Sequence, residues 1–226
     1  MKTATHISTT NRINRQKAGC SSFLTAQAQV VLSESFEVPD TTNFITYGIG
    51  SSFVTTDTAW NVLGGSVDIY EAAARPEAVA YDLDQAVDLA GSPGAAIIET
   101  SFSTTPGQGY QLSFYYARNN NLGIALGEAR VETEGASILL DRTIQHDPQV
   151  YSFSQHLYFN DTFIADSSTT KLRFTSLVDG VAGITLDAIT ISEIDIPTYA
   201  VPIPVFGVMA MAAGLVLIVF RRKLGK

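Results

Sequence analysis

The segment Tyr110-Gln111-Leu112-Ser113-Phe114-Tyr115-Tyr116 carries the pattern that decides the fold. Large apolar or aromatic side chains stand at positions 110, 112, 114 and 116, and they alternate with Gln111, Ser113 and Tyr115. Residues two apart lie on the same face of a strand, so this alternation predicts a strand with one buried and one exposed face. The segment 171–176 has the same alternation. Tyr115 is expected on the exposed face.

Short runs of this kind recur between residues 31 and 195, separated by Gly, Pro, Asn and Asp. Ten or eleven short strands at a spacing of roughly ten residues favour an all-β fold, an antiparallel jelly-roll sandwich, and we predict this fold for 31–195. The predicted strands are Ser33–Val38, Ala59–Leu63, Val67–Tyr70, Val79–Leu83, Ala95–Ser103, Tyr110–Tyr116, Leu122–Thr133, Ser137–Ile144, Val150–Phe159, Lys171–Ser176 and Gly183–Glu193.

The last predicted strand contains an irregularity. Ile184 and Leu186 share one face, whereas Ile189 and Ile191 have the opposite parity. Either both faces of this strand are buried, or a β-bulge near Asp187-Ala188 resets its register.

The formal net charge of −8 is distributed unevenly along the chain. The first 17 and the last six residues hold eight of the 14 bases, while 31–195 holds the other six and all 22 acids, a net charge of −16. Such an acidic body cannot bind nucleic acid by neutralising phosphates, but it suits an extracellular location and divalent cations. Cys20 is the only cysteine and lies outside the body, which excludes a disulfide and a zinc–thiolate site there.

The C-terminal residues predict a membrane-spanning helix. An uncharged apolar run covers 205–220, and counting back through Val201 gives about 20 residues, enough as a helix to span a bilayer core. The basic end 221–226 is expected on the cytoplasmic side. Residues 196–204 form a Pro-containing linker.

Residues 1–30 form a basic leader without an acidic residue. Ala26-Gln27-Ala28 has the small-x-small pattern of a signal peptidase site, but the stretch before it is short and polar. The leader is interpreted either as a degenerate signal peptide or as a disordered basic segment.

Pro202-Ile203-Pro204, the apolar run and Arg221-Arg222-Lys223 together resemble the PEP-CTERM sorting signal of Gram-negative bacteria. Ile203 stands where the type motif of that class has glutamate. The resemblance implies an exported protein whose precursor is held transiently in the inner membrane. An exosortase-type enzyme would process it near Pro204 and deliver it to the cell surface or the extracellular biofilm matrix.

An ordered set of short motifs in the body resembles the galactose-binding-like jelly-roll domains of the choice-of-anchor C family. The motifs are Ser35-Phe36-Glu37, Trp60-Asn61-Val62, Gly65-Ser66-Val67-Asp68, Ala86-Val87-Asp88-Leu89-Ala90-Gly91, Pro93-Gly94, Gly109-Tyr110-Gln111-Leu112-Ser113-Phe114 and Gly183-Ile184-Thr185-Leu186-Asp187-Ala188-Ile189. The resemblance implies carbohydrate or matrix binding, by analogy of fold.

A structural calcium ion is predicted at Glu37 and Asp187. The two residues would be neighbours if the terminal strands pair, as they do in sugar-binding jelly rolls of this type. Ca²⁺ takes six to eight oxygen ligands, and two carboxylates with backbone carbonyls are a normal mixture. The alternative is that both are surface carboxylates.

Sugar recognition needs aromatic faces and hydrogen-bonding groups for hydroxyls. The candidate ligand-binding residues are Tyr115, Tyr81 and Trp60, together with Arg118, Asn119 and Asn120 of a polar loop. A tryptophan in a sandwich is more often a core residue, and an asparagine run is also typical of a turn.

Common catalytic motifs are absent from the sequence: it has no His-Glu-x-x-His pair, no Gly-x-Ser-x-Gly elbow and no phosphate-binding loop. The predicted function is an exported, surface-sorted, non-catalytic module that binds extracellular polysaccharide or matrix. A glycoside hydrolase or lyase on the same fold is one alternative, because carboxylates are plentiful. A ligand-free structural matrix protein is another.

Overall fold

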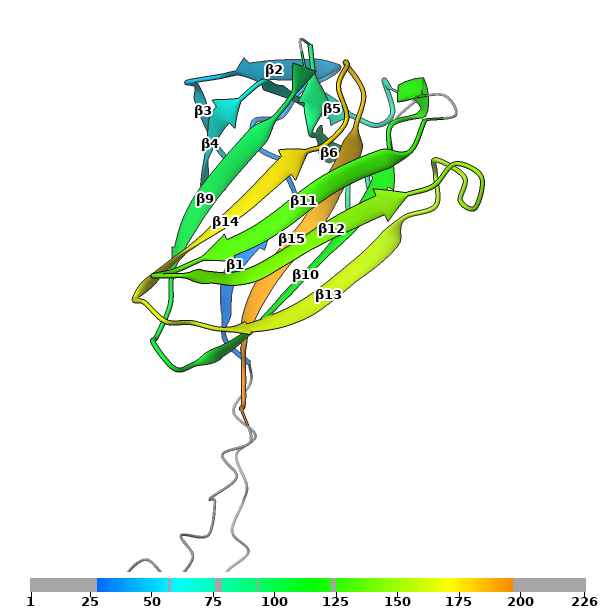
Figure 1. The fold of residues 1–226 in the computed structure, drawn as a ribbon. Helices are drawn as coiled ribbons and strands as arrows, with labels where there is room; N and C mark the ends of the chain where they lie inside the picture. The colour runs from blue at the N-terminus through cyan, green and yellow to red at the C-terminus, as the bar shows by residue number, and fades with distance from the viewer. Residues whose placement is uncertain (1–27, 57, 76–78, 93, 123–124, 197–226) are drawn as a thin grey trace, which may run out of the picture.

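The computed structural model describes residues 28–56, 58–75, 79–92, 94–122 and 125–196 (Figure 1). Most of the leader, the sorting residues Pro202, Ile203, Pro204, Arg221, Arg222 and Lys223, and the apolar run 205–220 lie outside these ranges, so what was expected of them stays a prediction. Within these ranges no helix is long and apolar enough to cross a membrane.

Two antiparallel sheets pack face to face, which confirms the predicted all-β sandwich (Figure 1). Sheet A has the order β13 (Leu157–Ile164), β10 (Gly109–Arg118), β15 (Ile184–Ile194), β6 (Gln85–Asp88), β5 (Ser66–Glu71) and β2 (Phe44–Gly48), with β1 (Val30–Glu34) also paired to β15. Sheet B has the order β12 (Ile138–His146), β11 (Gly127–Glu134), β14 (Thr169–Ser176), β9 (Ile97–Ser103), β4 (Ala59–Gly64) and β3 (Ser52–Val54). A small pair, β7 (Ala90–Gly91) and β8 (Gly94–Ala95), and a 3-10 turn η1 (Asn120–Leu122) complete the elements of the described residues.

The core between the sheets contains Trp60, Phe53, Phe114 and Phe174, which are almost fully buried. The Trp60 Nε1 donates a hydrogen bond of 3.0 Å to the buried carboxylate of Glu34, which also accepts from the Thr55 hydroxyl at 2.6 Å. The prediction of Trp60 as a sugar-binding residue is therefore wrong, because its indole is 0% exposed and belongs to the core.

Several predicted strand boundaries also differ from the structure. Residues 79–83 were expected as a strand but form a loop, in which Leu83 has a φ of 57° and is 71% exposed. The strand expected over 150–159 runs instead from Leu157 to Ile164. Strands β2 and β3 were not predicted, since they are only five and three residues long and give little periodic signal.

The pairing of β15 with β10 explains why the apolar residues of β15 change parity near the centre of the strand. Ile184, Leu186, Ile189 and Ile191 are all buried. The pairing with β10 shifts between Ser113↔Thr190 and Tyr115↔Asp187, so two residues of β15 stand opposite Phe114. Ala188, at this point, has a φ of 50°. The structure decides between the two alternatives in favour of the bulge at Asp187-Ala188, which allows both halves of the strand to point isoleucine or leucine into the core.

Candidate functional site

Three tyrosines from three separate segments meet on the outer face of sheet A. Tyr115 of β10 stacks on Tyr81 of the loop 79–84, with ring centroids 3.4 Å apart and planes inclined by 9°. Tyr158 of β13 lies beside Tyr115, with a centroid distance of 4.9 Å. Tyr81 is 47% and Tyr158 is 54% exposed. We call these three residues the tyrosine platform.

The platform continues into a polar surface along the same face. Gln111 and Ser113 share the outward parity of Tyr115 on β10, and the Gln111 Nε2 donates a hydrogen bond of 2.7 Å to the Asn160 Oδ1 on β13. On the other side of β10, Ser113 is paired with Thr190 of β15. Amides and hydroxyls, which can both donate and accept, therefore lie next to the exposed rings.

Two carboxylates attach the loop that carries Tyr81. The Asp187 Oδ2 accepts hydrogen bonds from the backbone N–H groups of Tyr81 and Asp82, at 2.7 and 2.8 Å. The Glu37 Oε1 accepts from the N–H groups of Asp84 and Gln85, at 3.1 and 2.8 Å. Asp187 is also the register partner of Tyr115. It therefore lies beside Tyr115 and also holds the loop that carries Tyr81.

Burial dominates the electrostatics of these two carboxylates. It raises the pKa of Asp187 to about 7, although its three backbone N–H partners act in the opposite direction. Burial also raises the pKa of Glu37, against the N–H groups of Gln85 and Asp84.

The predicted calcium site has a different arrangement from the one expected. The terminal strands β1 and β15 do pair, but the contacts of Glu37 and Asp187 are with N–H donors of the 81–85 segment. The described part of the chain contains no group of three or more His, Cys, Asp or Glu side chains that could hold a metal ion. These side chains alone do not make up a calcium site. Calcium binding stays a prediction that the melting temperature in Ca²⁺ and in EDTA would test.

A small cavity lies on the same outer face, over β2, β5 and β6. Its volume is about 150 Å³, and its lining includes Asp68, Tyr70, Asp88, Asn119 and Arg75. Asp68 and Asp88 are cross-strand partners, and Asp88 is also paired with Thr185 of β15. Because Thr185 and Asp187 are two apart on one strand face, the cavity and the tyrosine platform are neighbours on one surface.

The two cavity carboxylates are held by uncharged donors. The Asp88 Oδ1 accepts from the Ala90 N–H at 2.9 Å, and the Asp88 Oδ2 accepts from the Asn119 Nδ2 at 2.7 Å. The Asp68 Oδ1 accepts from the Thr46 hydroxyl at 2.6 Å. Burial is the main cause that raises the pKa of both groups, to about 7 for Asp88, and the charge of Arg75 acts in the opposite direction on Asp68.

The predicted ligand-binding residues are therefore divided between several places. Tyr81 and Tyr115 come together in the platform, and Asn119 lines the cavity. Asn120 is exposed at the start of η1 and does not line the cavity. Arg118 is 6% exposed, its Cβ lies near Gly127 and it does not line the cavity, so the structure does not bring it into either site.

Sequence reasoning missed Tyr158, Asp68 and the place of Asp88 in the cavity. The sequence pattern could have identified Tyr158 as exposed, because it stands two residues before Asn160 and four before Thr162 and so shares the face of these polar residues. The cavity residues had no such signal, since Asp68 and Asp88 become neighbours only through the pairing of β5 with β6.

A larger groove of about 740 Å³ lies at the side of the sandwich, lined by residues of β1, β4 and β9. It contains none of the predicted ligand-binding residues, and its aromatic members Phe102 and Tyr110 are buried. No aromatic face is therefore available there for a sugar ring.

No family model and no curated protein matches the sequence. Among solved structures, the chain is similar to the CBM22-1 xylan-binding domain of Paenibacillus barcinonensis Xyn10C, with 16% identity and a TM-score of 0.45 over 75% of this chain and 97% of that chain. A family 35 carbohydrate-binding module from Clostridium thermocellum has 12% identity and a TM-score of 0.39, over 74% and 98%. The Stig cyclase Fisc from Fischerella sp. TAU has 17% identity and a TM-score of 0.47, over 74% and 98%.

These similarities concern the fold alone.

Proposed function

We propose that the protein is an exported, non-catalytic module that binds an extracellular polysaccharide through the tyrosine platform. The observation that carries this proposal is the stacked pair Tyr81–Tyr115, which lies beside the exposed ring of Tyr158.

The chemistry of the platform suits a sugar chain. Aromatic side chains combine a large apolar face with few rotatable bonds, and the C–H face of a sugar ring can cover such a surface. Gln111, Asn160 and Ser113 supply donors and acceptors for hydroxyl groups within the same face. An exposed aromatic patch in a soluble domain indicates a partner that covers it.

Export and sorting form part of the same proposal. The acidic body and the Pro-Ile-Pro, apolar and basic segments of the tail support delivery across the inner membrane, processing by an exosortase-type enzyme and retention at the cell surface or in the matrix. Mass spectrometry of the secreted protein would test this route, because processing near Pro204 removes the apolar run.

The binding proposal is tested by affinity electrophoresis against a panel of soluble polysaccharides. Wild type should be retarded by at least one of them, and Tyr115→Ala and Tyr158→Ala should each weaken that retardation by about tenfold. Ile164→Ala is the matched control, since Ile164 is an exposed apolar residue on the same strand as Tyr158, beyond the platform. Retardation of all four proteins alike would contradict the proposal.

A glycoside hydrolase or lyase on the same fold is the second candidate, and the paired carboxylates Asp68 and Asp88 are the feature that favours it. Release of reducing sugar from the bound polysaccharide, abolished by Asp88→Asn, would replace the non-catalytic proposal. A ligand-free structural matrix protein would show neither retardation nor turnover, but concentration-dependent self-association.

A further inference from the structure

The cavity over β2, β5 and β6 has its own ligand chemistry, separate from that of the platform. We propose that this cavity is a second binding site, which takes one uncharged, hexose-sized polyhydroxyl group, the terminal sugar of a chain. The cavity's choice of a neutral sugar is argued from its own lining. Only the statement that this sugar ends a polysaccharide rests on the proposed function.

The lining offers acceptors and donors together. Carboxylate oxygens of Asp68 and Asp88 accept hydrogen bonds, the Arg75 guanidinium and the Asn121 amide can donate, and the Ser92 hydroxyl can do both. Adjacent sugar hydroxyls need this mixture, because each hydroxyl donates one hydrogen bond and accepts others. The ring of Phe44 adds an apolar surface at the same cavity.

Tyr70 also belongs to the lining of the cavity. Its side chain is 3% exposed, and its hydroxyl is buried next to the Thr185 hydroxyl, so a ligand in the cavity would not reach that hydroxyl. The groups that can contact a ligand are therefore the carboxylates, amides, hydroxyl and guanidinium named above.

The charges of the lining disfavour ionic ligands. An anion would face Asp68 and Asp88, while a cation would face Arg75, whose guanidinium lies 4.4 Å from the centroid of the Phe44 ring. A divalent cation would find only two carboxylates, and both oxygens of Asp88 already accept N–H donors. A neutral ligand with many hydroxyls meets none of these conflicts.

The size of the cavity limits the ligand to one unit. A volume of about 150 Å³ holds about five water molecules, which is enough for one sugar-sized group and too little for a chain that passes through. The neighbouring platform can hold further units of the same chain. The surface as a whole would therefore recognise the end of a polysaccharide and not its middle.

Titration of the ¹⁵N-labelled protein with glucose, galactose, mannose and xylose tests this inference by NMR. At least one monosaccharide should shift the amide signals of Asn119 and Asn121 and of the segment around Tyr70. Asp68→Asn and Asn119→Ala should each weaken its binding by about tenfold, whereas Asp84→Asn should leave it unchanged, since Asp84 is exposed and does not line the cavity.

Two results would overturn the proposal. One is the absence of shifts at the cavity signals with every sugar in folded wild-type protein; the other is displacement of the same signals by Ca²⁺ alone. The spectra of wild type decide the matter even where a variant fails to fold. Tyr158→Ala separates the two sites: it should weaken polysaccharide binding and leave monosaccharide binding intact, so failure of either proposal can be seen without the other.

Discussion

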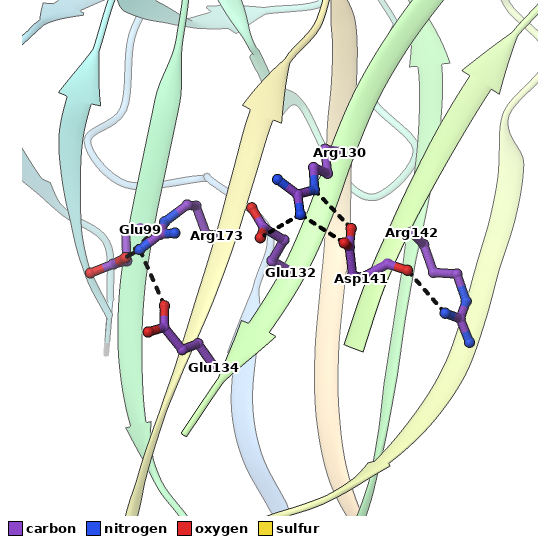
Figure 2. A network of polar contacts seen from close by, with 7 residues as sticks. All are labelled: Glu99, Arg130, Glu132, Glu134, Asp141, Arg142 and Arg173. Carbon is purple, nitrogen blue, oxygen red and sulfur yellow. Dashed lines mark hydrogen bonds and ion pairs between the residues drawn. The ribbon is translucent and has the colours of Figure 1, made fainter. Parts of the chain in front are cut away.

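The carboxylates on the outer faces of the two sheets have different kinds of partner. On sheet B, arginines and carboxylates of neighbouring strands form ion pairs (Figure 2). The Arg130 Nε and Nη2 each donate to Asp141 at 2.7 Å. The Arg173 Nη2 lies 2.5 Å from the Glu99 Oε2 and 3.5 Å from the Glu134 Oε2. On sheet A, the carboxylates Asp68, Asp88 and Asp187 are held by hydroxyl, amide and backbone N–H donors.

This difference indicates which face is available to a ligand. The groups on sheet B are satisfied by each other. The Arg130–Asp141 pair lies in solvent, where such ion pairs add little stability, whereas the side chains of Glu99 and Glu132 are only 12% and 8% exposed beside their arginine partners. Sheet A leaves aromatic rings exposed and keeps the carboxylates of Asp88 and Asp187 buried, which raises the pKa of each to about 7. Groups with a strongly shifted pKa cluster at functional sites, which supports the proposal that the ligand binds the outer face of sheet A.

The largest expected effect is an opposite response of the two faces to pH. The pKa of Asp88 is raised by burial to about 7, above its unfolded value, so its contribution to stability is complete below about pH 4 and is lost as the pH rises through 7. Wild type should lose up to about 4 kcal/mol relative to Asp88→Asn between pH 4 and pH 8. Urea unfolding of both proteins at several pH values measures this difference.

Asp141 on sheet B provides the control with the opposite sign. Hydrogen bonding to Arg130 lowers its pKa, so its contribution is present at neutral pH and is lost as the pH falls through the lowered value. If Asp88→Asn and Asp141→Asn shift the pH dependence in the same direction, the contrast between the faces is wrong.

The second effect concerns the attachment of the Tyr81 loop. Asp187→Ala removes the acceptor of three backbone N–H groups, and we expect a loss of about 2–3 kcal/mol in unfolding free energy with about tenfold weaker polysaccharide binding. Asp166→Ala is the matched control, because that carboxylate accepts the N–H groups of Ala136 and Ser137 in a loop outside the platform. Asp166→Ala should destabilise the protein without weakening binding.

A smaller effect measures the stack itself. A double-mutant cycle of Tyr81→Ala and Tyr115→Ala should give a coupling of about 1 kcal/mol in unfolding free energy, because the two rings are stacked in contact. The rings of Phe102 and Phe163, which meet edge to face in the core, give the reference value for a buried pair. A coupling of zero between the tyrosines would mean that they do not form a stack in solution.

The smallest effect is expected on sheet B. Asp141→Ala should change the unfolding free energy at neutral pH by less than about 1 kcal/mol and should leave polysaccharide retardation unchanged, since the pair with Arg130 is solvent-exposed. Loss of retardation in Asp141→Ala would place the ligand on the outer face of sheet B and contradict the comparison.

The strand pattern allowed the fold to be predicted largely from the sequence. Alternation at 110–116 and 171–176 identified strands of both sheets, and the change of parity in the last strand narrowed its structure to two alternatives, one of which was the bulge at Asp187-Ala188. The error at 79–83 has a physical reason: Val79, Tyr81 and Leu83 alternate like a strand, but Tyr81 stacks on Tyr115, Ala80 packs on Tyr70 and Ala86, and Leu83 is exposed.

The site could be predicted only in part. Parity alone placed Tyr115 outward, because the rule needs no partner strand. The cavity depends on pairing among β2, β5, β6 and β15, which the order of residues in the chain does not reveal. Trp60 was misassigned for a related reason, since an aromatic residue gives the same local signal in a core as on a binding surface.

The pairing of the first strand with the last has a mechanical consequence. Val30 at the start of β1 is paired with Ser192 near the end of β15, so both strands leave the domain at the same end (Figure 1). A force that separates these two ends loads the hydrogen bonds of β1 and β15 one after another, and the pair unzips. A force between the end of β15 and a ligand on the tyrosine platform acts lengthwise along the β10–β15 pairs, which share the load. The domain thus resists tension when it is anchored by its C-terminal strand alone and opens readily when it is pulled by both.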